Sequence, residues 1–410
     1  MASSFRPEPI PGPDAYSRRP DAAHAATTSK AVRPRRRTLA VLVTTVALAV
    51  SGVVAFASSA SAATTWRQVD GGWNFTCGIQ ADDTLWCWGD NEGGKLGLGD
   101  TTDRLTPTQV GSDNDWAAVT LGEYHACGLK TSGKAYCWGS NGSGQLGVGS
   151  TSGRNTPTAV GGATLWTTLI AGGYHNCGVA TSGGVFCWGL NDGGQLGLGD
   201  HTDRTSPVRV GAASTWVSVA AGDRFSCGLR NDGVRFCWGS NTFDQLGLGD
   251  DAERTTPATL SGDGAWVFLG GSSAGHACGV STAKYLYCWG RNDDGNLGVG
   301  DYVSRDTPAR VSTHAWGSVV AGYFHTCGLY TNGTRFCWGD NQYGELGIGD
   351  TTGRTAPRRL LGEGAWASIN AGGDHTCGIR TDGGLYCWGR NDFGQLGIGS
   401  TTNQTRPVRV

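Results

Sequence analysis

Short stretches in which apolar and polar residues alternate recur throughout residues 66–410, and each ends at Gly, Asn or Asp. One stretch, residues 116–160, illustrates the pattern. Its predicted elements are strand 116–120, turn 121–124, strand 125–130, hairpin loop 131–133, strand 134–138 and a fourth extended segment from Pro157 to Val160. No apolar pattern of helical period extends over three turns in this region. We therefore expect an all-β fold.

Two cysteines face each other in the predicted hairpin, because counting outward from Ser132 places Cys127 opposite Cys137. Directly opposed cysteines on antiparallel strands are close enough to form a disulfide. All 14 cysteines repeat this spacing of ten residues. The expected disulfides are Cys77–Cys87, Cys127–Cys137, Cys177–Cys187, Cys227–Cys237, Cys278–Cys288, Cys327–Cys337 and Cys377–Cys387. Buried free thiols fit the opposed register less well, and no spacing of a closed zinc site occurs.

The cysteine pairs recur about every fifty residues in seven copies. A period near fifty residues indicates one supersecondary unit repeated in tandem, and a chain that begins and ends at the same phase indicates a closed ring. Trp116, Asn141 and Pro157 have counterparts in all seven copies. Residues shared by every copy serve the packing that every copy needs. The sequence therefore predicts a seven-bladed β-propeller of about 50-residue repeats, with four-stranded blades and one hairpin disulfide per blade.

The first 63 residues have a different character. Residues 1–38 lack apolar periodicity and end in a basic cluster, and residues 39–63 contain an apolar run followed by small residues. This order is typical of a secretory signal, with cleavage after Ala62 or Ala63. A twin-arginine signal at Arg36-Arg37 and an uncleaved membrane anchor are the alternatives. Residues 64–410 form the predicted propeller domain.

The propeller region carries 24 Lys and Arg against 31 Asp and Glu, a formal charge of −7. An acidic body without a basic stripe argues against nucleic-acid binding. Disulfides persist in oxidising compartments, so we expect a secreted protein. We also expect it to be monomeric and to have no membrane attachment after cleavage. No catalytic motif is present, and we expect no enzymatic activity, cofactor or metal. At one repeat position, five copies have histidine and the other two have Phe75 and Phe225. Because phenylalanine cannot ligate a metal, this pattern favours a structural role for the histidines over metal binding.

Variable residues gather in two loops that the strand directions place on the same rim. The first loop precedes the histidine position, and the second follows the repeated Asn. The variable residues that we expect to bind a partner are Trp73, Asn74, Glu123, Tyr124, Tyr174, Asp223, Arg224, Phe243, Tyr323, Phe324, Tyr343, Asp374 and Phe393. Exposed aromatic and arginine side chains on a rigid platform are typical of binding hot spots. The alternative is that these rings fold inward over the glycine-rich connectors.

The strings CWGSNGSGQLGVG and CWGDNEGGKLGLGD, with AGGYHNCGV upstream in another copy, resemble the repeat of the regulator of chromosome condensation family. The resemblance covers residues 66–410 and implies a seven-bladed propeller closed by pairing one terminal segment with the other end. The family includes a nuclear exchange factor for a small GTPase, a plant ultraviolet-B receptor and secreted bacterial inhibitors of β-lactamase. The cysteine pairs distinguish this chain from the nuclear members of the family. A resemblance to the photoreceptor would imply several tryptophans just before the histidine position, where this chain has only Trp73.

These observations favour a secreted, non-enzymatic scaffold that binds an extracellular protein through one aromatic-rich rim. Inhibition of an extracellular enzyme is one form that this function could take. The alternative is a carbohydrate- or cell-wall-binding module, because aromatic side chains also stack on sugars.

Overall fold

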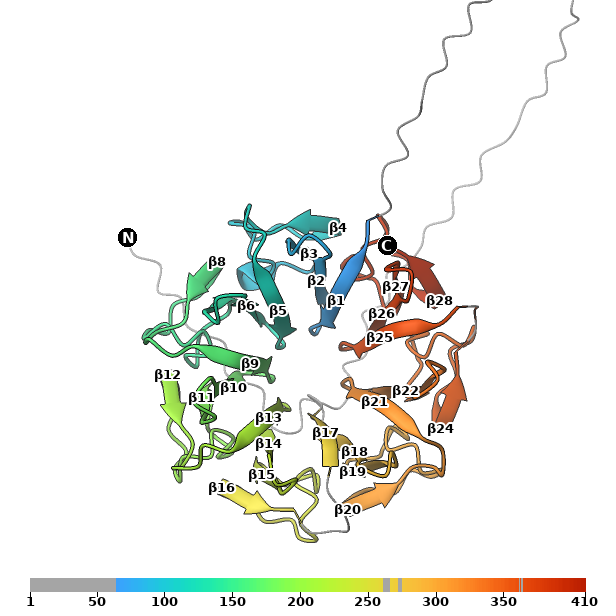
Figure 1. Ribbon diagram of the computed structural model, residues 1–410. Helices are drawn as coiled ribbons and strands as arrows, with labels where there is room; N and C mark the ends of the chain where they lie inside the picture. The colour runs from blue at the N-terminus through green and yellow to red at the C-terminus, as the bar shows by residue number, and fades with distance from the viewer. Residues whose placement is uncertain (1–63, 261–265, 272–274, 361, 363) are drawn as a thin grey trace, which may run out of the picture. The chain divides into compact units, whose positions relative to one another are not determined.

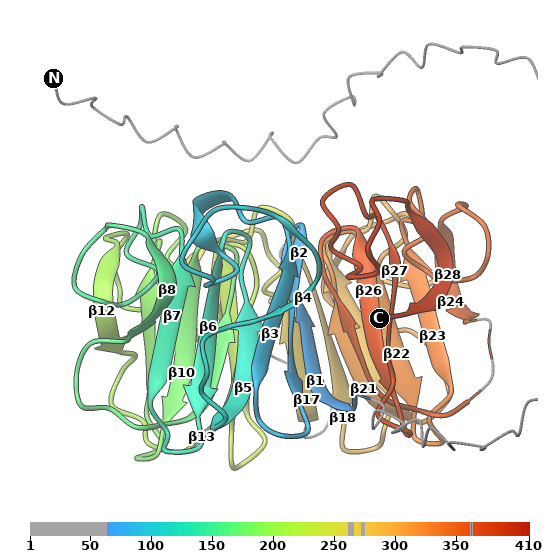
Figure 2. The same cartoon turned by 90° about the horizontal axis from the view of Figure 1, so that it is seen from above.

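The computed structural model describes residues 64–410, apart from 261–265, 272–274, 361 and 363. The predicted signal segment, residues 1–63, lies outside the described residues. Within the propeller unit, Thr64–Val410, seven four-stranded antiparallel sheets are arranged as blades around a central axis (Figure 1). The strands of each blade run between two opposite rims (Figure 2). The predicted fold class is confirmed.

Four strands make each blade, in the order in which the chain forms them. The strands nearest the axis are β1 (Trp66–Gly71), β5 (Trp116–Leu121), β9 (Trp166–Ala171), β13 (Trp216–Ala221), β17 (Trp266–Gly271), β21 (Trp316–Ala321) and β25 (Trp366–Ala371). The second strands are β2 (Phe75–Gln80), β6 (His125–Lys130), β10 (His175–Ala180), β14 (Phe225–Arg230), β18 (His276–Ser281), β22 (His325–Tyr330) and β26 (His375–Arg380). The third strands are β3 (Leu85–Gly89), β7 (Ala135–Gly139), β11 (Val185–Gly189), β15 (Arg235–Gly239), β19 (Leu286–Gly290), β23 (Arg335–Gly339) and β27 (Leu385–Gly389). The outermost strands are β4 (Arg104–Gln109), β8 (Arg154–Ala159), β12 (Arg204–Arg209), β16 (Arg254–Thr259), β20 (Arg305–Arg310), β24 (Arg354–Arg359) and β28 (Gln404–Arg409), and a 3-10 turn, η2, covers Glu92–Gly94.

The hairpin between the second and third strands has the predicted register, with Cys127 paired to Cys137. All seven expected disulfides form, and no cysteine among the described residues remains free. Gly133 in the loop has a φ of 80°, a left-handed conformation that glycine adopts without steric penalty. Asp83 and Lys284 occupy the same loop position in two other blades, with φ values of 65° and 66°.

The fourth strand begins earlier than the sequence suggests. We expected it to open at Pro157, but β8 starts at Arg154, which pairs with Gly139 after an irregularity in the register. Proline fits within this strand because an outermost strand leaves N–H groups on one side without ladder partners. The arginine that repeats at one connector position stays within its own blade. Arg104 bonds the Thr102 carbonyl and the Asp100 carboxylate of its own connector.

The ring closes without exchange of strands, which corrects the expected pairing of one terminal segment with the other end. The first and last blades are each built from four consecutive strands. Hydrogen bonds between the blades join them: the Trp66 N–H donates to the Gly383 carbonyl at 2.9 Å, and the Gly399 N–H donates to the Leu105 carbonyl at 2.9 Å. The Gly71 N–H also donates to the Asn370 side-chain oxygen at 2.9 Å.

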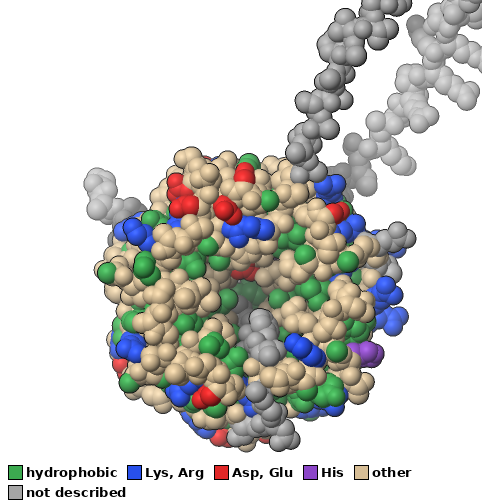
Figure 3. All heavy atoms as spheres, viewed as in Figure 1, with side chains coloured by type: hydrophobic (Ala, Val, Ile, Leu, Met, Phe, Trp, Pro, Cys, Tyr) green, Lys and Arg blue, Asp and Glu red, His purple; other side chains and the backbone are tan. Residues whose placement is uncertain are grey.

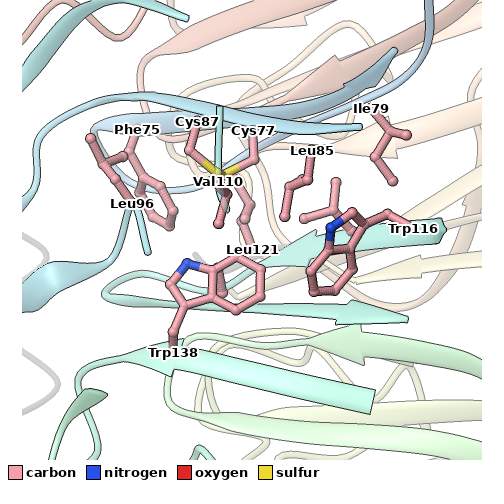
Figure 4. Close-up of a cluster of buried hydrophobic side chains, with 12 residues drawn as sticks. Phe75, Cys77, Ile79, Leu85, Cys87, Leu96, Val110, Trp116, Leu121 and Trp138 are labelled. Carbon is pink, nitrogen blue, oxygen red and sulfur yellow. A yellow bond between two sulfur atoms is a disulfide. The ribbon is translucent and has the colours of Figure 1, made fainter. Parts of the chain in front are cut away.

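Each pair of neighbouring blades shares an apolar core. Figure 4 shows the core between the first two blades, where the Cys77–Cys87 disulfide lies among aliphatic and aromatic side chains. The Trp138 indole N–H crosses to the preceding blade and donates to the Lys95 carbonyl at 2.9 Å. The same indole bond recurs at every blade boundary, including Trp88 to the Gln395 carbonyl at 3.0 Å. The repeated tryptophans therefore hold the ring together as scaffold.

The histidine position forms a second link between blades. His375 Nε2 lies 2.8 Å from the Thr76 hydroxyl, which itself donates to the Gln395 carbonyl. Equivalent pairs join His125 to Asn176, His175 to Ser226, His276 to Thr326 and His325 to Thr376. Where the histidine is replaced by Phe75 or Phe225, the facing residue of the next blade is Ala126 or Ala277. Each polar ring thus meets a polar partner, and each apolar ring meets a methyl group.

Burial keeps these histidines neutral. All five are fully buried, and desolvation lowers the pKa of His125 and His375 to about 4 and of the other three to about 3. Each ring contacts the neighbouring blade through Nε2. This geometry supports the structural role that the repeat pattern indicated.

Candidate binding rim

Two sets of loops meet at one end of the blades, and we call this end the turn rim. It consists of residues 72–74 and 90–95 and their counterparts in the other six blades. The Asp90 N–H donates to the Asn74 carbonyl at 3.0 Å, which places the two loops of one blade side by side. Turns of adjacent blades are also joined, since the Gly373 N–H donates to the Gly72 carbonyl at 3.0 Å. The second, third and fourth blades are joined in the same way, since the Glu123 N–H donates to the Gly173 carbonyl and the Gly173 N–H donates to the Gly222 carbonyl.

All of the variable residues singled out in the sequence lie on the turn rim, but they are more buried than a freely exposed platform would be. Trp73, Tyr124, Tyr174, Arg224, Phe243, Phe324, Tyr343 and Phe393 are partly buried. Asn74, Glu123, Asp223, Tyr323 and Asp374 are buried. The aromatic rings pack against rim neighbours while part of each stays accessible.

Several of these side chains converge over the axis. The Trp73 ring, from the first blade, packs edge-to-face on Tyr323 of the sixth blade, with centroids 4.3 Å apart. Trp73 also approaches Phe324, at 6.3 Å. Blades that are not neighbours in a ring can touch only where they meet at its centre. We call this group the axial cluster and define it as Trp73, Glu123, Tyr174, Asp223, Arg224 and Tyr323.

Glu123 is the more buried of the two acids of the axial cluster, with only 4% of its surface exposed. Desolvation raises the pKa of Glu123 to about 8, and the Asp223 carboxylate adds to the rise. The hydroxyls of Tyr174 and Tyr323 and the charge of Arg224 act in the opposite direction. Glu123 therefore interacts with groups from the third, fourth and sixth blades at once.

Farther from the axis, arginines stack on the rim aromatics. The Arg291 guanidinium lies 5.3 Å from the Phe243 ring centroid, and Arg390 lies 4.8 Å from that of Tyr343. Both arginines also form ion pairs, Arg291 with Asp293 at 2.8 Å and Arg390 with Asp392 at 2.7 Å. These contacts hold the rings in fixed orientations on the surface.

The two rims differ in charge. The turn rim carries twelve Asp and Glu against four Lys and Arg. Its acids are Asp90, Glu92, Glu123, Asp192, Asp223, Asp244, Asp293, Asp294, Asp340, Glu345, Asp374 and Asp392. The opposite end, the hairpin rim, consists of residues 80–84 and 109–115 and their counterparts, and its described residues carry six acids against nine bases. Figure 3 shows basic side chains around the periphery of the face seen in Figure 1, and a hollow at its centre.

Two charged residues on the turn rim escaped the sequence reasoning. Lys95 and Glu345 stand where four other blades have Gln, and both are fully buried. Lys95 forms a 2.5 Å ion pair with Asp90. Glu345 accepts a hydrogen bond from the Tyr343 N–H at 2.8 Å, and desolvation raises its pKa well above the usual range. Comparing the seven copies at this one position would have found both.

The described part of the chain contains neither a metal-binding cluster nor a membrane-spanning helix. No cluster of three or more His, Cys, Asp and Glu side chains has the geometry to hold a metal ion. No helix there has the length and apolar character needed to cross a membrane.

A ring of seven four-stranded blades with glycine-rich connectors and an indole bond at each boundary defines a propeller of the chromosome-condensation-regulator type. The model of the RCC1-like domain matches residues 51–317, and the RCC1 repeat model matches residues 318–345 and 366–395. A second RCC1 repeat model matches residues 332–379 and 382–410. The chain therefore belongs to the RCC1-like domain family. None of the curated proteins compared with it matches.

Solved structures share the fold at low sequence identity. Human WBSCR16 superposes with a TM-score of 0.72 at 21% identity, covering 80% of this chain and 94% of that one. Prp20p from Saccharomyces cerevisiae, described together with its binding to Gsp1p and histones, gives 0.70 at 20% identity, covering 84% and 87%. The CRINKLY ectodomain of the Arabidopsis thaliana receptor kinase ACR4 gives 0.50 at 19%, covering 83% and 98%. These likenesses show a common fold.

Proposed function

We propose that the protein is a secreted, non-enzymatic scaffold that captures an extracellular protein through its turn rim. The observation that carries this proposal is the convergence of non-repeated aromatic, arginine and carboxylate side chains at one end of an otherwise repetitive ring. Trp, Tyr and Arg dominate binding hot spots because they offer large contact area at low entropic cost. The side chains of the repeated residues, by contrast, make the contacts between blades.

Export is supported by the pairing of all 14 cysteines in disulfides, since such bonds are rare in the cytosol. The signal-like order of residues 1–63 agrees with this. Prp20p, a neighbour of the same fold, is described as binding Gsp1p and histones, which gives a precedent for protein capture by such a propeller.

The orientation of the rings favours a protein over a glycan as the partner. Trp73 and Tyr323 pack edge-to-face at 72°, and Trp73 and Phe324 meet at 74°. A sugar ring needs an open aromatic face on which to stack, whereas these rings cover one another. The cell-wall module would be favoured instead if the affinity for insoluble peptidoglycan equalled the affinity for every protein tested.

The test is capture of an extracellular partner followed by affinity measurement with matched variants. β-Lactamase and a cell-wall hydrolase are the first purified proteins to assay, for binding and for inhibition. Trp73→Ala combined with Phe324→Ala should weaken binding at least a hundredfold, because each removes about 2 kcal/mol or more of hot-spot energy. Tyr285→Ala with Val234→Ala, on the hairpin rim, is the control. Equal affinity of the two double variants would contradict the proposal.

A further inference from the structure

A cavity of about 100 Å³ lies at the hairpin end of the sixth blade. Its walls come from the hairpin loop 332–334, from the start of β23, and from described residues of the connector between β24 and β25. This space is several times the roughly 10–15 Å³ that a cavity must offer to hold one water molecule. A small anion therefore fits inside it.

Arg335 lines this cavity and is only 4% exposed. Its Nη1 has no hydrogen-bond partner, and it forms no ion pair with any described carboxylate. The Trp366 ring is its nearest compensation, with the guanidinium carbon 3.0 Å from the ring centroid. Burial and the charge of Arg380 lower the pKa of Arg335. Arg335 is thus a buried cation without an anion, which is a costly arrangement.

Two further arginines stand around the cavity. Arg359 lines it and is exposed to solvent. Arg380, from the seventh blade, lies beside the connector, because a methyl group placed on Gly364 would be 3.6 Å from Arg380 Cδ. The Arg380 guanidinium stacks on the Tyr386 ring at 4.0 Å, and its Nε has no hydrogen-bond partner. Neither arginine forms an ion pair with a described residue, so the positive charge accumulates.

The three arginines occur together at only one of the seven blade boundaries. The counterparts of Arg335 in the other copies are Leu85, Ala135, Val185, Arg235, Leu286 and Leu385. Arg235 differs from Arg335, because its Nη2 donates to the Leu260 carbonyl at 3.2 Å. Thr259 and Ser281 stand at that boundary in place of the other two arginines. The ring therefore closes without this cluster elsewhere, and the cluster is not part of the shared scaffold.

We infer that the cavity is a binding site for a doubly charged tetrahedral oxyanion, phosphate or sulfate, which accepts hydrogen bonds from Arg335. The planar fork of guanidinium donors matches the oxygens of such an anion. Two negative charges offset two of the three arginines, and Arg335 Nη1 gains the acceptor that it lacks. The site lies at the opposite end of the blades from the turn rim, so this inference goes beyond the proposed function and does not depend on it.

Calorimetric titration of the full chain tests the inference with inorganic sulfate and phosphate. Both anions should bind saturably at an ionic strength held constant with chloride. Acetate, with one charge, should bind at least tenfold more weakly. Phenyl phosphate distinguishes the two sources of the anion: an affinity like that of phosphate identifies an ester as an acceptable ligand, and rejection restricts the site to the free ion.

Arg335→Leu is the decisive variant, because three other blades have Leu at this position and fold with it. It should weaken sulfate binding at least tenfold. Without the anion it should raise the unfolding temperature, since it removes an uncompensated buried cation. Arg359→Gln, at an exposed position, should also weaken binding. Arg230→Gln is the matched control and should leave the affinity unchanged, because Val185 replaces the buried arginine at its boundary.

Three results would overturn the inference. The first is an absence of saturable binding, or equal affinity of the parent and Arg335→Leu for sulfate. The second is an affinity for acetate equal to that for sulfate. The third is binding that appears only after Glu363→Gln, a change in the same connector but outside the described residues, because the anion of the cluster would then be a carboxylate of the chain itself.

Discussion

The same repeat builds both rims of the propeller. The two rims nevertheless differ in charge and in the contacts that their residues make between blades. On the hairpin rim, tight loops such as residues 131–133 follow disulfide-bonded strands, and among its described residues bases outnumber acids by nine to six. On the turn rim, acids outnumber bases three to one, and residues of non-adjacent blades meet over the axis. The repeated residues of the strands and hairpins thus stabilise the ring. The turn rim varies between copies and is available for the proposed partner binding. Stability and binding should therefore respond to different substitutions.

The largest expected effect is on stability and comes from a hairpin disulfide. Replacing Cys127 and Cys137 by Ala should lower the free energy of unfolding by about 3 kcal/mol, because the bridge restricts the unfolded chain. Both cysteines are fully buried, so the lost sulfur contacts add to the effect. Urea unfolding measures the loss. Capture of the extracellular partner at the turn rim should be retained, and its loss would show that the two regions are not separable.

Glu345→Gln should stabilise the protein at pH 7, because the neutral amide removes the cost of ionising a buried carboxyl. The carboxyl pKa is raised in the folded state by burial and by Asp340 and Asp374. Stability from the neutral form is therefore complete below the unfolded pKa of about 4.5 and is lost as the pH rises towards the folded pKa. Unfolding curves of the variant and the parent should coincide near pH 4 and diverge above it. The matched change Gln395→Glu should create the same loss in another blade.

The link between His175 and Ser226 should show coupling of about 1–2 kcal/mol in a double-mutant cycle. His175→Phe or Ser226→Ala alone leaves a buried polar group without its partner. The two changes together reproduce the Phe225–Ala277 pair that the propeller already contains. Denaturant unfolding of the four proteins gives the coupling energy. If the two single losses of stability simply add in the double variant, then the pairing of histidine with a polar residue and of phenylalanine with alanine has no energetic basis.

The smallest expected effect is at Lys284, whose φ of 66° is unfavourable for a residue with a side chain. Lys284→Gly should stabilise the protein by about 0.5 kcal/mol, since relief of left-handed strain outweighs the added freedom of the unfolded chain. Gly133→Ala in the equivalent loop should have the opposite sign. Thermal unfolding of both variants provides the comparison.

The blades could be predicted because period-two alternation and opposed cysteines determine a hairpin locally. The start of β8 could not, since the pairing of Arg154 with Gly139 depends on a register irregularity that has no sequence signature. Ring closure depends on geometry across the whole chain. Trp73 and Tyr323 are 250 residues apart in the numbering, so their contact follows only once seven blades are closed. Differences between copies pointed to the turn rim but not to the axial cluster.

Photocrosslinking from each rim tests the central claim most directly. A benzoylphenylalanine replaces Tyr343 on the turn rim in one protein and Tyr285 on the hairpin rim in another, and both are exposed to the same extracellular partner. Both tyrosines are partly buried, and each has an arginine over its ring, so the sites are matched. The account predicts an adduct from position 343 and none from position 285. An adduct from position 285 alone would place recognition on the hairpin rim and contradict the account.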